Sequence, residues 1–312
     1  MKHHYVPSFY LKEWAGPKGL LCEYQRVLSQ KIVPRRTAPD GTGYVENLYR
    51  IDGVPEEQAH AFETMFLQPV DSQARDALKK MVAFQELTEA ERSAFTRLML
   101  SLLFRNPEAV ADIKKHMLNV WNAAIDSLRD NYPQWRAEAD PEDFADFVER
   151  PSPGARFMRV MNLLYESIDN PKVGNAIFQM CWSCVSLEEA SGILLTSDRP
   201  LELANGLGSP NALITMPLGP KHLFVASHRD SRWLRNLAPA KIVEEVNKGV
   251  VARARKMVWG VDDARLDFVR EWMSREPDRV LISPLQKREA IEAARGDGER
   301  ELEMVFPHYR PD

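Results

Sequence analysis

The chain opens with MKHHYVPSFYL (residues 1–11), which places two histidines, two tyrosines and a proline where a terminus usually carries little structure. Pro7 disfavours the helical conformation for Val6 and favours an extended segment. The aromatic and apolar neighbours of the histidines are residues suited to burial. We therefore expect a docked strand, in which His3 and His4 point to opposite faces.

Outward from this segment, short strand patterns occur at both ends of the chain. GLLCEYQRV (19–27) and QKIVP (30–34) are rich in β-formers, and so are GILLTSD (192–198), ALITMPL (212–218) and HLFVAS (222–227). We expect α+β architecture, with strands from the two ends paired in one small sheet. The predicted organisation is a single domain over residues 1–270, followed by a helical and charged tail over residues 271–312.

A helical block is predicted between about residues 55 and 190. Apolar residues recur every four positions at Phe62, Phe66, Val70, Ala74 and Leu78, which predicts one helix face. Pro69 and Pro107 should kink or split their helices, and Thr88 with Glu91 predicts a capping box. Two further segments are expected to be helical, AIFQMCWSCVSL (176–187) and PAKIVEEVNKGVVARARKMVWG (239–260).

Composition restricts the class of protein. The 312 residues carry a net charge of −4, so nucleic-acid binding would need a local basic patch. No apolar run reaches the length of about 18 residues needed to span a membrane. Three cysteines argue against a disulfide framework and for a reducing compartment, so we expect a cytoplasmic protein that does not bind membranes.

His4 is the first candidate for chemistry. Its imidazole titrates near neutrality and could serve as a general base or a metal ligand. The alternative is an aromatic-rich strand in which the imidazole hydrogen-bonds a backbone carbonyl.

Asp198 is the second candidate. It follows an apolar strand in LLTSDRPL (194–201), where it could bind a metal, orient a histidine or hold an arginine. The alternative is an Asx turn that closes the strand.

Arg105 closes the apolar stretch LMLSLLF (98–104) and is expected to be partly buried. A buried arginine needs a carboxylate partner, for which Glu63, Asp71 and Asp198 are the candidates. An ion-pair network that only holds helices together is the competing interpretation.

Cys181 and Cys184 spell C-x-x-C within the expected helix 176–187. The sequence has no second ligand pair for zinc, and the strand-then-helix context of a redox motif is missing. We therefore interpret the two residues as buried structural thiols.

Several of these segments together resemble the DUF4238 family of uncharacterised bacterial and fungal proteins. The resemblance spans about residues 2–260 and includes HHYVPSFYL, YVENLYRI, the helix with Glu63 and Asp71, LFRNP, LLTSDRPL, ITMPLGPKHLF and VNKGVVARAR, in that order. His4 takes the position of the histidine before Tyr-Val-Pro. The resemblance implies no reaction, and it directs attention to His4, Tyr5, Asp198, Glu63 and Arg105.

Two functions from different classes remain open. The first is a metal-assisted or acid/base hydrolase, expected to be a nuclease or phosphodiesterase. His4 would act as base or ligand, Asp198 as ligand or orienter, and Arg105 as a stabiliser of negative charge, with a divalent metal and a nucleic-acid or other phosphate-containing substrate. The second is a non-enzymatic recognition or effector module in bacterial defence or stress response. Convergence of His4 with Asp198 or another carboxylate would favour the enzyme, whereas burial of His4 against backbone groups would not.

Overall fold

The computed structural model describes residues 1–28, 30–148 and 155–296. The chain divides into two compact units. The first consists of Met1–Leu48, Glu63–Pro107 and Glu166–Arg279, and the second of Tyr49–Phe62, Glu108–Tyr165 and Val280–Asp312. The two units interleave along the chain, whereas the predicted division placed a single boundary at residue 270. Residues 297–312 of the predicted tail lie outside the described residues.

The first unit holds three antiparallel sheets. One pairs β1 (Lys2–His4) with β4 (Tyr44–Glu46). A second has the order β3 (Ile32–Thr37), β2 (Leu21–Arg26), β10 (Met257–Gly260) and β6 (Thr196–Ser197). A third has the order β5 (Cys181–Ser186), β9 (His222–Ser227), β8 (Leu213–Gly219) and β7 (Glu202–Ala204). The second sheet confirms that strands from both ends of the chain pair, although they share the unit with two other sheets.

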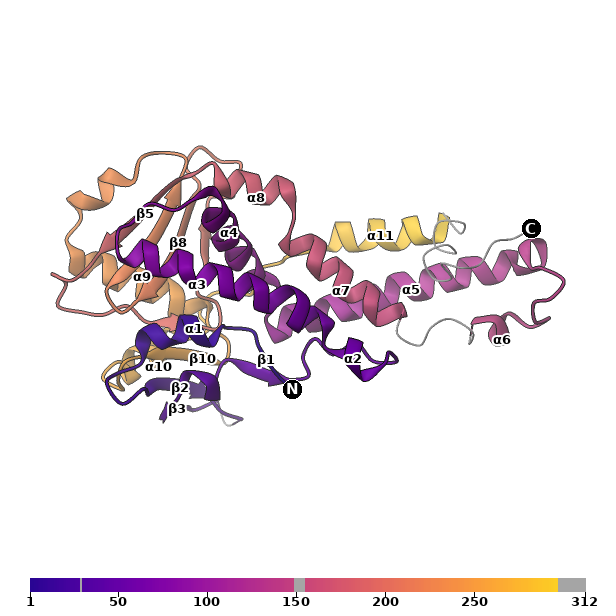
Figure 1. The fold of residues 1–312 in the computed structure, drawn as a ribbon, viewed down its shortest axis with the longest axis horizontal. Helices are drawn as coiled ribbons and strands as arrows, with labels where there is room; N and C mark the ends of the chain where they lie inside the picture. Colours follow the sequence, from indigo (N-terminus) through magenta and orange to yellow (C-terminus); the bar gives the residue numbers. More distant parts are fainter. Residues whose placement is uncertain (29, 149–154, 297–312) are drawn as a thin grey trace. The chain divides into compact units, whose positions relative to one another are not determined.

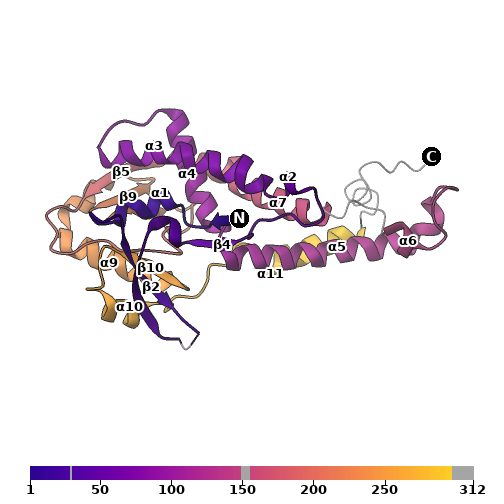
Figure 2. The ribbon, with the colours of Figure 1, turned by 60° about the horizontal axis from the view of Figure 1, so that its bottom comes forward.

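Helices cover these sheets. The helical elements of this unit are α1 (Ser8–Leu11), η1 (Lys12–Trp14), η2 (Pro39–Gly41), the π-helix η3 (Phe62–Leu67), α3 (Gln68–Val82), α4 (Glu89–Phe104), α8 (Pro171–Phe178), η4 (Ser231–Asn236), α9 (Pro239–Arg253) and α10 (Leu266–Trp272). Figure 1 shows α4 close to β5. Phe95 of α4 packs on Trp182 of β5 and Phe224 of β9. Figure 2 shows α10 beside β2 and β10, where Val269 joins their buried core. The α+β class is confirmed.

The second unit is helical in its described part. It contains α2 (Glu56–Ala59), α6 (Phe144–Val148), α11 (Pro284–Gly296) and most of α5 (Pro107–Trp135) and α7 (Ala155–Ile168). Tyr132 of α5 packs on two phenylalanines of α6, and Lys287 of α11 forms an ion pair with Asp112 of α5 at 2.6 Å. Among the described helices, none has the length and apolar composition needed to cross a membrane.

Proline and capping signals mark the helix ends correctly. Pro69 is the second residue of α3, directly after the π-helix η3 ends at Leu67, so the helix changes type beside Pro69 and is not interrupted. Pro107 begins α5, and Thr88 and Glu91 form the predicted capping box of α4.

Two predicted helices are wrong at their C-terminal ends. The helix expected over 239–260 ends at Arg253, and residues 257–260 form β10, whose two neighbouring strands satisfy its backbone groups. The helix expected over 176–187 ends at Phe178 and continues as β5. Side chains alternate between the faces of a strand. Accordingly Cys181 is exposed, so it is not the buried thiol that was predicted. Cys184 is half-buried, and burial raises the pKa of its thiol to about 12.

Candidate functional site

The opening segment docks through the short strand β1 at residues 2–4, and its residues 8–11 form the helix α1 and not the expected strand. His3 and His4 pair with Val45 and Tyr44 across β1 and β4; His3 is fully buried and His4 half-buried. The carbonyl oxygen of Gly43 accepts hydrogen bonds from the amides of the next two residues of the segment, at 2.9 and 3.1 Å. Gly43 has a φ of +68°, and a Cβ there would lie 3.1 Å from the Val6 carbonyl oxygen, so this close approach requires glycine.

Two aromatic side chains anchor the residues that follow. The buried Tyr10 hydroxyl lies 2.8 Å from the Thr196 hydroxyl and donates to the Pro217 carbonyl oxygen at 2.7 Å. Trp14 donates to the Leu194 carbonyl oxygen at 2.8 Å. These bonds join the start of the chain to strands near residues 194–217, because a buried hydroxyl or indole N–H needs a partner.

Arg105 is enclosed next to two carboxylates. It caps the C-terminus of α4, is fully buried, and donates from Nη1 to Asp71 Oδ1 at 2.9 Å. This confirms that Arg105 is buried and identifies Asp71, among the three candidates, as a partner. Burial raises the pKa of Asp71, although the positive charge of Arg105 opposes the rise.

Glu63 adds a second carboxylate to this cluster. It is 6% exposed, and burial raises its pKa to about 7, while Arg105 lowers the pKa and Asp71 raises it. Its Oε2 atom has no hydrogen-bond partner among the described residues. Glu63 lies on the π-helix η3, a backbone form that often occurs at functional sites. Sequence periodicity did not predict the π-helix.

The charge of Arg105 also affects the pKa of His4. Burial is the main reason that the pKa of His4 is lowered, and the charges of Arg105 and Lys2 lower it further. Asp40 opposes them through its charge and a backbone hydrogen bond. The Nε2 atom of His4 is buried without a hydrogen-bond partner among the described residues. We refer to His4, Glu63, Asp71 and Arg105 as the His–Arg–carboxylate cluster.

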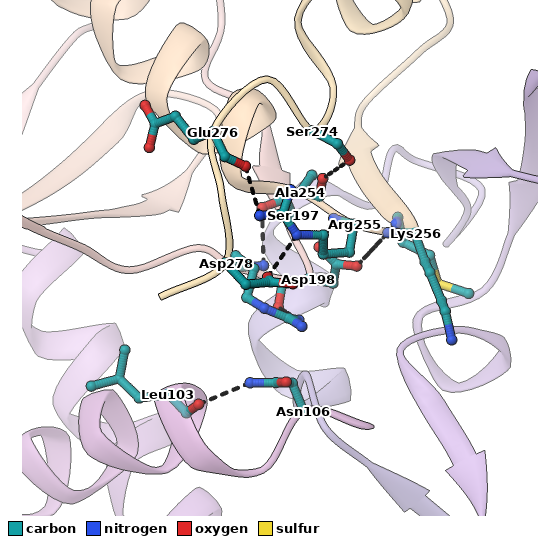
Figure 3. A network of polar contacts seen from close by, with 12 residues as sticks. Leu103, Asn106, Ser197, Asp198, Ala254, Arg255, Lys256, Ser274, Glu276 and Asp278 are labelled. Atoms are coloured by element: carbon teal, nitrogen blue, oxygen red, sulfur yellow. Dashed lines mark hydrogen bonds and ion pairs between the residues drawn. The ribbon is translucent and has the colours of Figure 1, made fainter. Parts of the chain in front are cut away.

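Asp198 has a different role in the structure. Its Oδ1 accepts from the amide of Arg255 at 2.9 Å, and its Oδ2 accepts from the amides of Lys256 and Met257 at 2.7 and 3.2 Å (Figure 3). The carboxylate therefore holds the turn that leads from α9 into β10. It satisfies backbone donors of a distant segment and does not form a local Asx turn.

Tyr5 connects the opening segment to this turn. It is 3% exposed, and its hydroxyl lies 3.5 Å from the sulfur of Met257, whose amide Asp198 binds. Among the described residues no hydrogen bond or ion pair is identified between His4 and Asp198. Asn106, next to Arg105, donates to the Leu103 carbonyl oxygen at 2.8 Å (Figure 3).

Two further polar residues contribute to this region, and sequence reasoning missed the first of them. Asp40 influences His4 from the turn of η2, and nothing in its local sequence, PDG, points beyond a turn. Asn247 of α9 accepts from the amide of Leu195 at 2.7 Å and donates to the carbonyl of Ile193 at 2.9 Å. Its position beside the apolar face of the helix was the available signal.

The described side chains were searched for clusters of metal-ligating type. Within residues 1–28, 30–148 and 155–296, no group of three or more His, Cys, Asp and Glu side chains is arranged to hold a metal ion. The metal role expected of His4 and Asp198 stays a prediction.

Comparison with known proteins gives one family. No curated protein matches the chain, and no solved structure does. The model of a family described as "Protein of unknown function (DUF4238)" matches residues 2–264, which include every member of the His–Arg–carboxylate cluster as well as Asp198. The protein therefore belongs to the DUF4238 family.

Proposed function

We propose that the protein is an acid–base hydrolase, acting on a phosphodiester, whose chemistry is centred on the His–Arg–carboxylate cluster. One observation carries the proposal. His4 Nε2 and Glu63 Oε2 are both enclosed without a hydrogen-bond partner among the described residues, and both side chains lie in the field of Arg105. A buried polar atom without a hydrogen-bond partner lowers the stability of the fold. Its presence therefore points to a function.

The protonation states suit proton transfer near neutral pH. The lowered pKa of His4 keeps its imidazole neutral at pH 7, so Nε2 can accept a proton from a water molecule. The raised pKa of Glu63, about 7, leaves a large protonated fraction that can donate to a leaving oxygen. The two groups thus supply a base and an acid that both lie in the field of Arg105.

Arg105 supports the choice of a phosphodiester. Its guanidinium is held by Asp71. A fixed positive charge beside the acid and the base would stabilise negative charge that develops on a phosphoryl group. Among phosphodiesters, the proposal favours a nucleic acid as the substrate. A divalent metal is added to the assay to test whether the reaction needs one.

The test is hydrolysis of bis(4-nitrophenyl) phosphate and of single-stranded DNA and RNA, each with EDTA and with Mg²⁺ or Mn²⁺. We expect His4→Ala and Glu63→Gln each to lower kcat by about 10²–10⁴ while the thermal transition stays cooperative. His228→Ala is the matched control, because His228 is exposed and its ring nitrogen contacts the backbone carbonyl of Leu207. Wild-type rates in both cluster variants would refute the proposed roles.

The second candidate is a recognition or effector module in bacterial defence or stress response. It is favoured by the bonds of Tyr10 and Trp14, which account for the opening motif as a structural anchor. Absence of turnover by the wild type on all of these substrates, with and without metal, would support this alternative.

A cytoplasmic location is also part of the proposal. All three cysteines are free thiols, as expected in a reducing compartment. Recovery of the native protein in a membrane or secreted fraction would contradict this location.

A further inference from the structure

A cavity lies between α4 and α8, apart from the His–Arg–carboxylate cluster. Its volume is about 410 Å³, which is within the range of small-molecule sites. The two helices run close to each other in Figure 1. The lining residues from α4 are Ser93, Thr96, Arg97 and Leu100, and those from α8 are Pro171, Gly174, Asn175 and Phe178. In both helices the lining residues are three or four positions apart, so they lie on one face of each helix, and this face lines the cavity.

Gly174 keeps this space open. It lies inside α8 with ordinary helical geometry, and a Cβ there would meet no atom within 4 Å. Neither backbone strain nor steric conflict requires glycine, and glycine is the less stable choice in a helix interior. A larger side chain at this position would project into the cavity. The open space is therefore retained at the expense of helix stability, as expected of a binding site.

Arg97 supplies a polar anchor. Its Nε donates to Asp169 Oδ1 at 2.6 Å, and among the described residues no hydrogen bond occupies its Nη atoms. The first amides of α8 are not available to an anion, because Asn170 accepts from the amides of Lys172 and Val173 at 3.1 Å each. An anionic ligand would bind to Arg97.

The apolar part of the lining limits the rest of the ligand. Leu100 and Ile168 are buried, and the Phe178 ring is half-buried beside them. Asp169 already compensates part of the charge of Arg97, which favours a monoanion over a phosphate dianion. A planar carboxylate matches the guanidinium fork.

We propose that this cavity binds a small monocarboxylic acid with a flat apolar body. The carboxylate binds the Nη atoms of Arg97, and the body packs on Leu100, Ile168 and Phe178. The site shares no residue with the His–Arg–carboxylate cluster, so it stands whether or not the hydrolase proposal holds.

The probe is 3-phenylpropionate, compared with 3-phenylpropan-1-ol, which has the same body without the charge. Titration of the full-length protein by calorimetry should give a Kd of about 1 mM or below for the acid and at least about tenfold weaker binding of the alcohol. Arg97→Met should weaken binding of the acid until its affinity equals that of the alcohol. Arg129→Met is its control, because Arg129 also forms a single carboxylate pair but is exposed on α5.

Gly174→Leu tests the cavity itself. It should weaken binding of the acid at least about tenfold without lowering the thermal transition, because the leucine occupies open space. Gly208→Leu is the matched control, since Gly208 is exposed and also has no atom within 4 Å of a built Cβ. The proposal is overturned by any of three results: no saturable binding up to about 10 mM, equal affinity for acid and alcohol, or unchanged binding in Gly174→Leu.

Discussion

Glu63 is expected to make the stability of the protein fall as the pH rises. Its pKa is raised from 4.5 to about 7 by burial. Between these two values the unfolded chain loses the proton of Glu63 while the folded chain keeps it. The folded state then binds more protons than the unfolded state, so the free energy of unfolding decreases with pH across this window. Glu63→Gln removes the titration and should remove this decrease.

The size of the effect follows from the pKa difference. The raised pKa of Glu63 corresponds to about 3 kcal/mol of stability that is present below pH 4.5 and lost once the pH passes 7. Roughly 2.5 kcal/mol of this loss should fall between pH 5 and pH 8. The side chain is only 6% exposed, so solvent screening reduces the figure little.

The assay is urea denaturation of the wild type and Glu63→Gln at half-unit steps of pH. The difference in unfolding free energy between the two should grow with pH in favour of Glu63→Gln, whereas His4, Asp71 and Arg105 are present in both proteins. Glu57→Gln makes the same chemical change at an exposed position of α2 and should leave the wild-type slope unchanged. A constant difference from pH 5 to pH 8 would refute the raised pKa and, with it, the role of Glu63 as an acid.

Three further changes test the surrounding contacts. Asp71→Ala removes a carboxylate from the fully buried Arg105 and should cost about 3–5 kcal/mol in unfolding free energy, whereas Asp126→Ala at an exposed pair should cost less than about 1 kcal/mol; equal costs by urea denaturation would contradict the buried pair. Asp198→Ala leaves three backbone amides without their acceptor and should lower stability by about 2–4 kcal/mol, measured the same way, and an unchanged midpoint would argue against its turn-holding role. Tyr10→Phe loses two buried contacts of the hydroxyl and should cost about 1–3 kcal/mol by thermal unfolding, so a shift within error would show that this anchor carries no stability.

Much of the local structure could be predicted from the sequence, because proline, capping residues and side-chain periodicity act on the backbone within a few residues. Pro69 lies next to the point where the π-helix η3 passes into α3, and Thr88 and Glu91 cap α4 as expected. The pattern failed where the environment overrode it. Residues 257–260 continue the periodicity of α9 but form β10, because the strands on both sides of them complete their hydrogen bonds.

The choice of partners was decided by tertiary structure. The sequence pointed to a buried Arg105 with three possible carboxylates, but the contact with Asp71 spans 34 positions. Asp198 looked like a partner for His4, yet its oxygens are taken by amides 57 to 59 positions away. Periodicity and turn chemistry describe neighbours along the chain, and they carry no information about which distant groups share a buried volume. The opening MKHHYVPSFYL therefore indicated by itself a docked strand, which holds for residues 2–4, whereas residues 8–11 form α1. Only the fold decided that His4 would lie near Arg105 with its Nε2 enclosed.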